Sequence, residues 1–157
     1  MFPIFTKKQL TTLRIFLEDT GFYRIPLTKL ATGHYKFTAK INNCKGSFIL
    51  DTGASTSCIG IDRIEQFSLL NEDSEIKAAG AGAINMETQI ARNNMFSVKK
   101  LSLTETDFIL FDLSHVNEAL AQASEKAIDG IIGADLLKRY RAVIDYGRNC
   151  FYLKINR

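Results

Sequence analysis

The stretch that most constrains the fold of this chain is residues 48–55, Phe-Ile-Leu-Asp-Thr-Gly-Ala-Ser. Three apolar residues run directly into Asp51, which is the pattern of a buried strand that ends at a carboxylate. An ionised carboxylate is costly to bury without a partner, so a strand built for stability alone rarely ends this way. Gly53 permits a tight turn and a close approach of other backbone groups. Taken alone, the motif also fits an ordinary strand followed by a polar turn.

A second stretch, residues 128–137, reads Ile-Asp-Gly-Ile-Ile-Gly-Ala-Asp-Leu-Leu and places two apolar residues and a glycine ahead of a short helical run. Together the two stretches resemble the retropepsin-like aspartic proteases, in particular the single-lobe bacterial members. The resemblance extends over about residues 35–155. It implies a mostly β fold, a single-lobe acid-protease β-barrel with a few short helices. We expect an N-terminal segment over residues 1–33 and the retropepsin-like domain over residues 34–157.

The resemblance also implies the roles of the site residues. Asp51 is the catalytic acid/base residue, and Thr52, Gly53 and Ala54 complete the active-site loop. The Thr52 hydroxyl is expected to hydrogen-bond across a dimer axis. The residues expected to pack against the loop are Ile131 and Gly133. The residues expected to contact substrate are Ser55, Gly80, Ala81, Gly82, Ile84 and Ile132, of which those at 80–84 belong to a hairpin flap without an aromatic residue at its tip.

The chain contains a single Asp-Thr-Gly. Asp129 is followed by Gly130 without a hydroxyl residue between them, so it is not a second site. Hydrolysis of an amide by paired carboxylates needs one ionised group to activate water and one protonated group to donate to the carbonyl oxygen. The second carboxylate must therefore come from a second copy of Asp51 across a two-fold axis, and we expect a homodimer whose monomer is inactive.

Two departures from the family pattern carry further expectations. Ala54 lacks the hydroxyl that two-lobed members use to hydrogen-bond a catalytic carboxylate, so we expect a mildly rather than strongly acidic pH optimum. Ser55 and Ala134 stand where retroviral members carry an ion pair between Asp and Arg. The dimer must then be held in another way, and the chain termini, with strand 151–155 pairing with its mate, are the candidate.

The rest of the chain is read from periodicity and turn residues. A helix is expected from a capping box at residues 6–9 to a stop at Gly21, as a docked helix, a pro-segment or a dimerisation arm. The further expected elements are extended chain over 22–33, a hairpin of 35–41 and 47–51, a weak helix over 61–70, a solvated loop over 71–74, the flap hairpin over 77–90, one strand over 96–103, a buried strand over 108–111, a helix over 112–126, a strand over 128–132, a short helix over 134–140 and a closing hairpin of 142–146 and 150–155.

Composition narrows the classes of function. The chain has 20 basic and 17 acidic residues, a net charge of +3, and no basic run with interleaved aromatics, so we expect no nucleic-acid partner. Two histidines and three cysteines give no zinc pattern and no disulfide framework, and we expect no metal and no cofactor. No stretch approaches the roughly 20 apolar residues of a membrane helix, and the N-terminus does not read as a signal peptide, so the expected location is cytoplasmic without membrane contact.

The sequence therefore predicts an aspartic endopeptidase that binds extended peptide and hydrolyses it between two Asp51 carboxylates. One alternative is a retropepsin-like domain that binds peptides or scaffolds partners without turnover. The other is a latent enzyme whose N-terminal residues block the cleft until they are removed.

Overall fold

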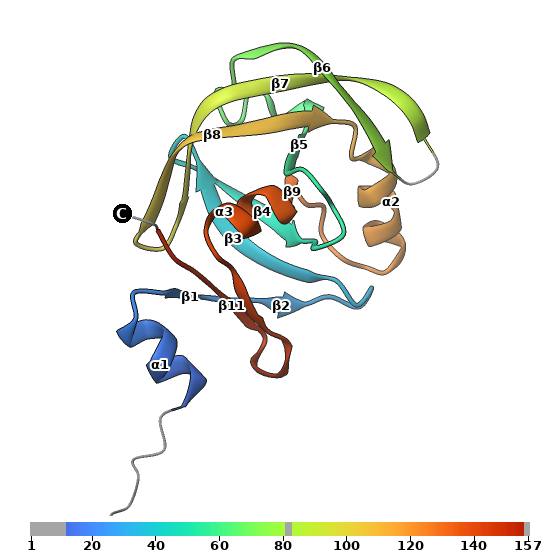
Figure 1. Cartoon of the computed structure of the whole chain (residues 1–157). Helices are drawn as coiled ribbons and strands as arrows, with labels where there is room; N and C mark the ends of the chain where they lie inside the picture. Colours follow the sequence, from blue (N-terminus) through green and yellow to red (C-terminus); the bar gives the residue numbers. More distant parts are fainter. Residues whose placement is uncertain (1–11, 81–82, 156–157) are drawn as a thin grey trace, which may run out of the picture.

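The computed structural model describes residues 12–80 and 83–155, and for residues 74–87 only the backbone is considered. The elements in chain order (Figure 1) are α1 (Leu13–Asp19), β1 (Tyr23–Pro26), β2 (Thr28–Lys29), β3 (Tyr35–Ile41), β4 (Cys44–Leu50), β5 (Cys58–Gly60), a 3₁₀ helix (Ile61–Arg63), β6 (Asn71–Gly80), β7 (Ala83–Val98), β8 (Leu101–Phe111), α2 (Ser114–Gln122), β9 (Gly130–Ile132), α3 (Ala134–Arg139), β10 (Val143–Asp145), a second 3₁₀ helix (Tyr146–Arg148) and β11 (Cys150–Leu153).

The larger sheet closes on itself. Its strand order is β2-β3-β4-β9-β5-β8-β7-β6, and β7 pairs a second time with β3. The barrel is therefore formed by strands β3, β4, β9, β5, β8 and β7. The long strands β7 and β8 curve along one side of it in Figure 1. The prediction of a mostly β, single-lobe barrel with a few short helices is confirmed.

The hairpin of β3 and β4 carries the candidate catalytic residue to its position. Its two turn residues, Asn42 and Asn43, have positive φ values of 48° and 69°. Asparagine tolerates this conformation, and a turn with both central residues at positive φ matches the twist of paired strands. The Asn42 side chain donates to the carbonyl of Phe67 at 3.0 Å and to Asn94 at 2.9 Å, which ties the turn to the barrel. The predicted hairpin is confirmed, and Asp51 directly follows its second strand.

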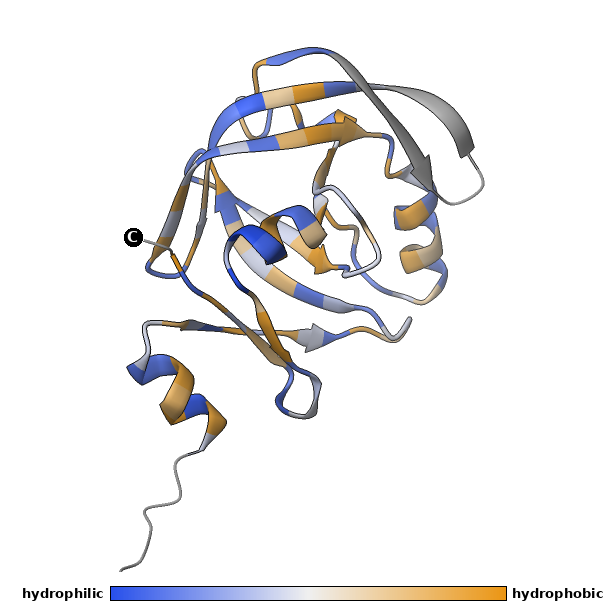
Figure 2. Ribbon diagram, in the orientation of Figure 1, coloured by the Kyte–Doolittle hydropathy of each residue, from blue (hydrophilic) through white to orange (hydrophobic). Residues whose placement is uncertain are grey.

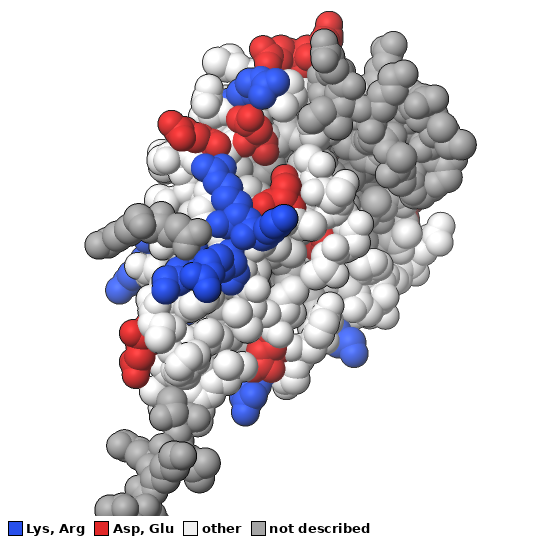
Figure 3. All heavy atoms as spheres, viewed as in Figure 1, with Lys and Arg blue, Asp and Glu red and all other residues white. Residues whose placement is uncertain are grey.

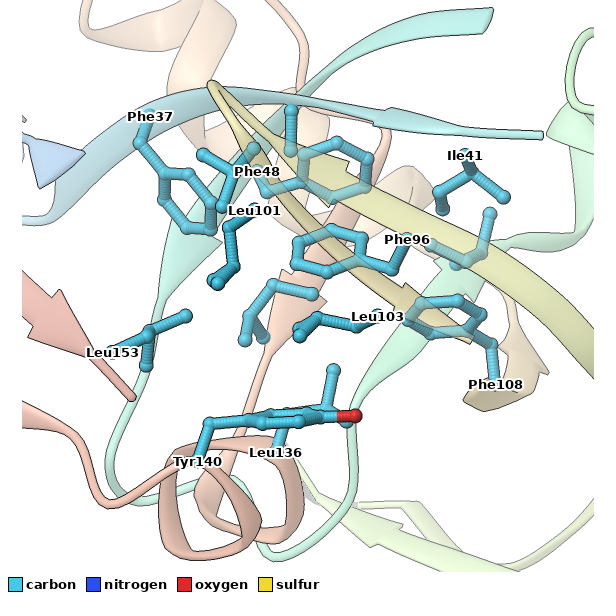
Figure 4. Packing of buried hydrophobic residues seen from close by; sticks show 14 of the residues in the cluster. Phe37, Ile41, Phe48, Phe96, Leu101, Leu103, Phe108, Leu136, Tyr140 and Leu153 are labelled. Atoms are coloured by element: carbon cyan, nitrogen blue, oxygen red, sulfur yellow. The ribbon is translucent and has the colours of Figure 1, made fainter. Parts of the chain in front are cut away.

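An aromatic cluster fills the barrel. The ring of Phe48 lies 6.1 Å from Phe37, 6.2 Å from Phe67 and 5.9 Å from Phe96 between centroids. Figure 4 shows the rings of Phe37, Phe48 and Phe96 among aliphatic side chains from several strands. All four phenylalanines are at most 4% exposed. Burial of large aromatic side chains is a main source of folding free energy, so this cluster holds β4 in place beneath Asp51.

A second, three-stranded sheet has the order β1-β11-β10. Its central strand is β11, which pairs with β1 on one side and β10 on the other. The expectation that the strand over 151–155 pairs with its mate in a dimer is therefore wrong for β11. The residues before the barrel form β1, and β1 occupies the edge of β11 that a mate would need.

Helix α1 packs on this second sheet. Thr12 caps its first turn, and its hydroxyl accepts from the Ile15 N–H at 3.3 Å. Gly21 ends the helix with φ +87°, as predicted. The buried side chain of Leu17 meets Cys150 and Tyr152 of β11. Figure 2 shows the remaining hydrophobic residues of α1 on a helix that projects from the barrel. The predicted capping box at residues 6–9 lies outside the described residues.

Three local expectations are wrong. Residues 61–70 form a 3₁₀ turn and further turns instead of a helix, because Phe67 and Leu69 are both buried and a helix would point residues two apart in different directions. Residues 71–74 start β6, an edge strand that tolerates exposed polar side chains. Residues 96–103 belong to two strands, since Lys99 at φ +54° turns the chain between Val98 and Leu101.

The other predicted elements are present with shifted ends. The hairpin predicted over 77–90 corresponds to β6 and β7, and the buried strand over 108–111 is the end of β8. The helices over 112–126 and 134–140 are α2 and α3, and the closing hairpin is β10 with β11. In the described part of the chain, no helix is long and apolar enough to cross a membrane.

Candidate active site

Asp51 lies at the end of β4, where the strand leaves the barrel. Its N–H donates to the carbonyl of Ile132 at 3.0 Å, which continues the parallel pairing of β4 with β9. Its carboxylate Oδ1 accepts from the Gly53 N–H at 2.8 Å. The Ile132 carbonyl therefore holds the backbone of Asp51, and the Gly53 N–H holds its carboxylate. Asp51 is half-buried, so its carboxylate stays open to a ligand.

The loop that follows Asp51 is held against the start of α3. The Ala54 carbonyl accepts from the Ala134 N–H at 2.7 Å. A Cβ atom on Gly133 would lie 2.5 Å from the same carbonyl oxygen, so only glycine fits there. The structure thus brings Gly133 against the active-site loop, where the resemblance places it. Ala134, at the position of the missing ion pair, joins the loop through its backbone.

The sequence reasoning missed a polar pair that locks the same loop. Ser57 is fully buried; its hydroxyl donates to Asp135 Oδ1 at 2.6 Å and its N–H donates to the same oxygen at 2.9 Å. The Ser57 hydroxyl in turn accepts from the Gly133 N–H at 2.9 Å. The available signal was a serine just before the apolar pair of β5 and an aspartate in the first turn of α3, since buried polar residues need such partners.

Cys58, the next residue, lies close to the site. Burial raises the pKa of its thiol to about 11, and the nearby carboxylates of Asp135 and Asp51 add to the rise, while a backbone hydrogen bond involving Ile131 opposes it. The thiol is therefore protonated at neutral pH and serves as an apolar packing group. All three cysteines, including Cys44 and Cys150, are free.

The remaining predicted site residues are placed as follows. Thr52, Gly53 and Ser55 are exposed, and the Thr52 hydroxyl makes no hydrogen bond with any described residue. Ile132, expected to line a subsite, is only 2% exposed and packs in the core, because alternate residues of β9 face inward. Ile131 is half-buried and packs with Cys58. Gly80 ends β6 and Ile84 lies in β7, whereas Ala81 and Gly82 lie outside the described residues.

Within the described ranges, no three acidic, histidine or cysteine side chains are grouped so that they could hold a metal ion. Asp51 presents one accessible carboxylate on a loop held by backbone hydrogen bonds.

Comparisons with known proteins agree with this geometry. The sequence pattern of the family described as aspartyl protease matches residues 37–136, which is more than half of the chain and spans both motifs. No curated protein matches the sequence.

Solved structures with a similar fold include a retropepsin-like aspartic protease from Rickettsia conorii, at a TM-score of 0.55 and 17% identity over 85% of this chain and 88% of that one. The retroviral protease-like domain of Ddi1 from Leishmania major is 17% identical, with a TM-score of 0.49 over 85% of this chain and 94% of that one. The EIAV protease is 19% identical, with a TM-score of 0.44 over 73% and 86%. With its barrel, its Asp-Thr-Gly loop and the matched family pattern, the chain belongs to the aspartyl protease family, with a retropepsin-like fold.

Proposed function

We propose that this protein is an aspartic endopeptidase that acts as a homodimer on extended peptides. The observation that carries the proposal is the position of the Asp51 carboxylate. It is half-buried, it accepts a hydrogen bond from the Gly53 N–H, and its loop contacts Gly133 and Ala134 at the start of α3. A binding module has no use for a carboxylate fixed in this way. The matched family supports the same reaction class.

The dimer follows from the chemistry of the site. One chain supplies one Asp-Thr-Gly. In the proposed dimer, two Asp51 carboxylates face each other and share one proton, since two like charges so close cannot both ionise. The exposed Thr52 hydroxyl, which has no partner among the described residues of its own chain, is then free to bond across the axis.

In the proposed reaction, water lies between the two carboxylates. The ionised Asp51 removes a proton from the water as its oxygen attacks the peptide carbonyl carbon, and the protonated Asp51 donates its proton to the carbonyl oxygen. The tetrahedral diol collapses when the proton on one Asp51 carboxyl passes to the amide nitrogen, the other, ionised Asp51 takes the proton of one diol hydroxyl, and the carbon–nitrogen bond breaks to leave a carboxylic acid and an amine. The carboxylates only move protons, so no cofactor is needed.

Latency through the N-terminal segment finds no support in the described part of that segment. Helix α1 packs through Leu17 on β11, at the β1–β11 side of the molecule, and Figure 1 shows it apart from the loop that joins β4 to β5. We therefore expect the full-length protein to be active, and a form lacking the N-terminal segment serves as a control in the test.

The test is cleavage of a mixed peptide library between about pH 4 and 7, with wild type beside Asp51→Asn. We expect cleavage by wild type that is lost in the variant and that rises with the square of protein concentration when dilute. Absence of cleavage by the full-length protein and by a form lacking the N-terminal segment would favour a domain that binds peptides without turnover.

A further inference from the structure

A basic hollow lies on the barrel and does not include Asp51 in its lining. Its floor is the middle of β3, at the point where β2 and β7, which both pair with β3, diverge from each other. The hollow has a volume of about 630 Å³, and its lining includes Lys36, Lys40, Lys45 and Lys99 but no acidic residue. Lys45 lies six residues before Asp51 on an extended strand, so this end of the hollow is about 20 Å from Asp51, whereas Lys36 at the other end lies opposite Ile49.

The register of the strands arranges donors in a row across the hollow. Lys40 of β3 lies directly opposite Lys45 of β4 on one side and opposite Ser97 of β7 on the other. Ser97 in turn lies opposite Ser102 of β8. Along β3, Lys36 and Lys40 are four residues apart and project on the same face. The hollow is thus lined by ammonium groups and hydroxyls.

The pairing of Lys40 with Lys45 is unfavourable in the free protein. Like charges directly opposite each other on antiparallel strands destabilise a sheet. Both side chains are exposed, and neither makes an ion pair with a described residue. An anionic ligand would relieve this repulsion.

A smaller hollow of about 320 Å³ extends the basic surface. It shares Ile25, Val98 and Lys99 with the first and adds Arg24 and Lys100. Its one acidic residue, Glu18, is already paired with Arg14 at 3.2 Å.

Several arginines of the described chain pair with acidic side chains, whereas some exposed cations outside the hollows, such as Lys126, Lys138 and Arg141, make no ion pair with a described residue. Arg92 pairs with Glu72 and Asp107, and Arg63 with Asp129. Figure 3 shows basic side chains between acidic ones over β6–β8, and a denser basic area over α3. The cations that line the two hollows also make no ion pair with a described residue, and the first hollow has no acidic residue in its lining.

We propose that the two hollows bind an extended acidic segment of another polypeptide. Two adjoining hollows suit a chain better than a single small anion, and lysines present point charges that pair with carboxylates without the planar fork that favours phosphate. The first hollow, which holds Lys36, Lys40 and Lys45, has no exposed aromatic ring on which a nucleic acid base would stack, since Phe37 is 4% exposed; the exposed Tyr23 lines only the second hollow. The Asn42 N–H donates toward β7, and along a strand the backbone groups of every second residue point to the same side. The N–H and carbonyl of Thr38 on β3 therefore point into the gap between β2 and β7, where a peptide backbone finds hydrogen-bond partners.

The test measures binding in the full-length Asp51→Asn protein, so that cleavage cannot remove the probe and the result does not depend on catalysis. The probe is a fluorescein-labelled peptide of alternating glutamate and serine, read by anisotropy. The variant is Lys40→Gln with Lys45→Gln. The matched control is Lys126→Gln with Lys138→Gln, two exposed lysines outside both hollows that remove the same charge.

We expect the acidic peptide to bind, the Lys40/Lys45 variant to raise Kd about fivefold, and the control to change it less than about twofold. The Lys40/Lys45 variant should also melt at a temperature no lower than that of the parent, which shows that it folds. Equal weakening by both variants, or absence of binding, overturns the proposal. Tighter binding of single-stranded oligothymidylate with the same dependence on Lys40 and Lys45 overturns it in favour of nucleic acid.

Discussion

The Ser57 hydroxyl donates to Asp135 Oδ1 at 2.6 Å, and this buried contact joins the active-site loop to α3. The same carboxylate oxygen accepts from the Ser57 N–H, so one side chain satisfies two buried donors. A hydrogen bond to an ionised acceptor is stronger than a neutral one, and a buried donor left unpaired costs free energy. The position of the loop that carries Asp51 therefore depends on the hydrogen bonds between Ser57 and Asp135.

Asp135→Ala should lower the free energy of unfolding by about 2–4 kcal/mol, because it leaves both Ser57 donors without an acceptor. Asp135→Asn retains an acceptor and should cost less. Urea unfolding measures both, with Asp107→Ala as control, since Asp107 makes only exposed contacts, an ion pair with Arg92 worth less than about 1 kcal/mol and a hydrogen bond from the Asn93 N–H. Equal losses of unfolding free energy for Asp135→Ala and Asp107→Ala would show that the buried pair stabilises the fold no more than an exposed contact does.

Gly133→Ala tests the close approach beneath the loop. The added Cβ would lie 2.5 Å from the Ala54 carbonyl oxygen, so the loop must shift, at a cost of about 1–3 kcal/mol. We expect peptidase activity to fall more than stability alone explains, because the shift moves Asp51. Gly147→Ala is the matched control: its nearest atom is 3.6 Å away and its backbone does not require glycine. The prediction fails if both variants retain parental activity.

The hairpin that carries Asp51 could be predicted from the sequence because its signals are local, whereas the barrel was implied by the resemblance that the two motifs carry. The apolar run of β4, the Asn42–Asn43 turn and the glycine of the second motif each determine their own conformation. The sequence was insufficient where the outcome depends on distant partners. Ser57 and Asp135 are 78 residues apart, and neither residue alone indicates the other.

The same limit explains the errors over β11 and residues 61–70. Nothing near β11 in the sequence shows that β1 takes its edge. Apolar residues over 61–70 have helical spacing, but the barrel buries Phe67 and Leu69 together, and tertiary packing overrides the local pattern.

The Cys58 thiol gives a prediction for alkaline pH. Its pKa is raised from the ordinary 9.0 to about 11, so the unfolded chain loses this proton first and the folded state loses stability as pH rises from about 9 to 11, with the full contribution present below that window. Cys58→Ala should flatten this part of the pH dependence of unfolding in urea. Iodoacetamide should modify Cys58 slowly in the folded protein at neutral pH. Rapid alkylation there, or identical pH profiles of parent and variant, contradicts the assignment.

Thr52→Ala separates the proposed dimer from the fold of the chain. Thr52 is exposed and its hydroxyl has no partner among the described residues of its own chain, so the substitution should change the free energy of unfolding of the monomer by no more than about 0.5 kcal/mol. In the dimer, two such hydroxyls are lost at the axis, and we expect weaker self-association and lower peptidase activity at equal concentration. Sedimentation equilibrium of parent and variant measures the first, and the peptide library assay the second. Ser55→Ala, another exposed hydroxyl residue of the same loop, is the control and should leave association unchanged. If Thr52→Ala associates and cleaves as the parent does, Thr52 does not lie at a dimer axis and the two Asp51 carboxylates are not brought together in the way proposed.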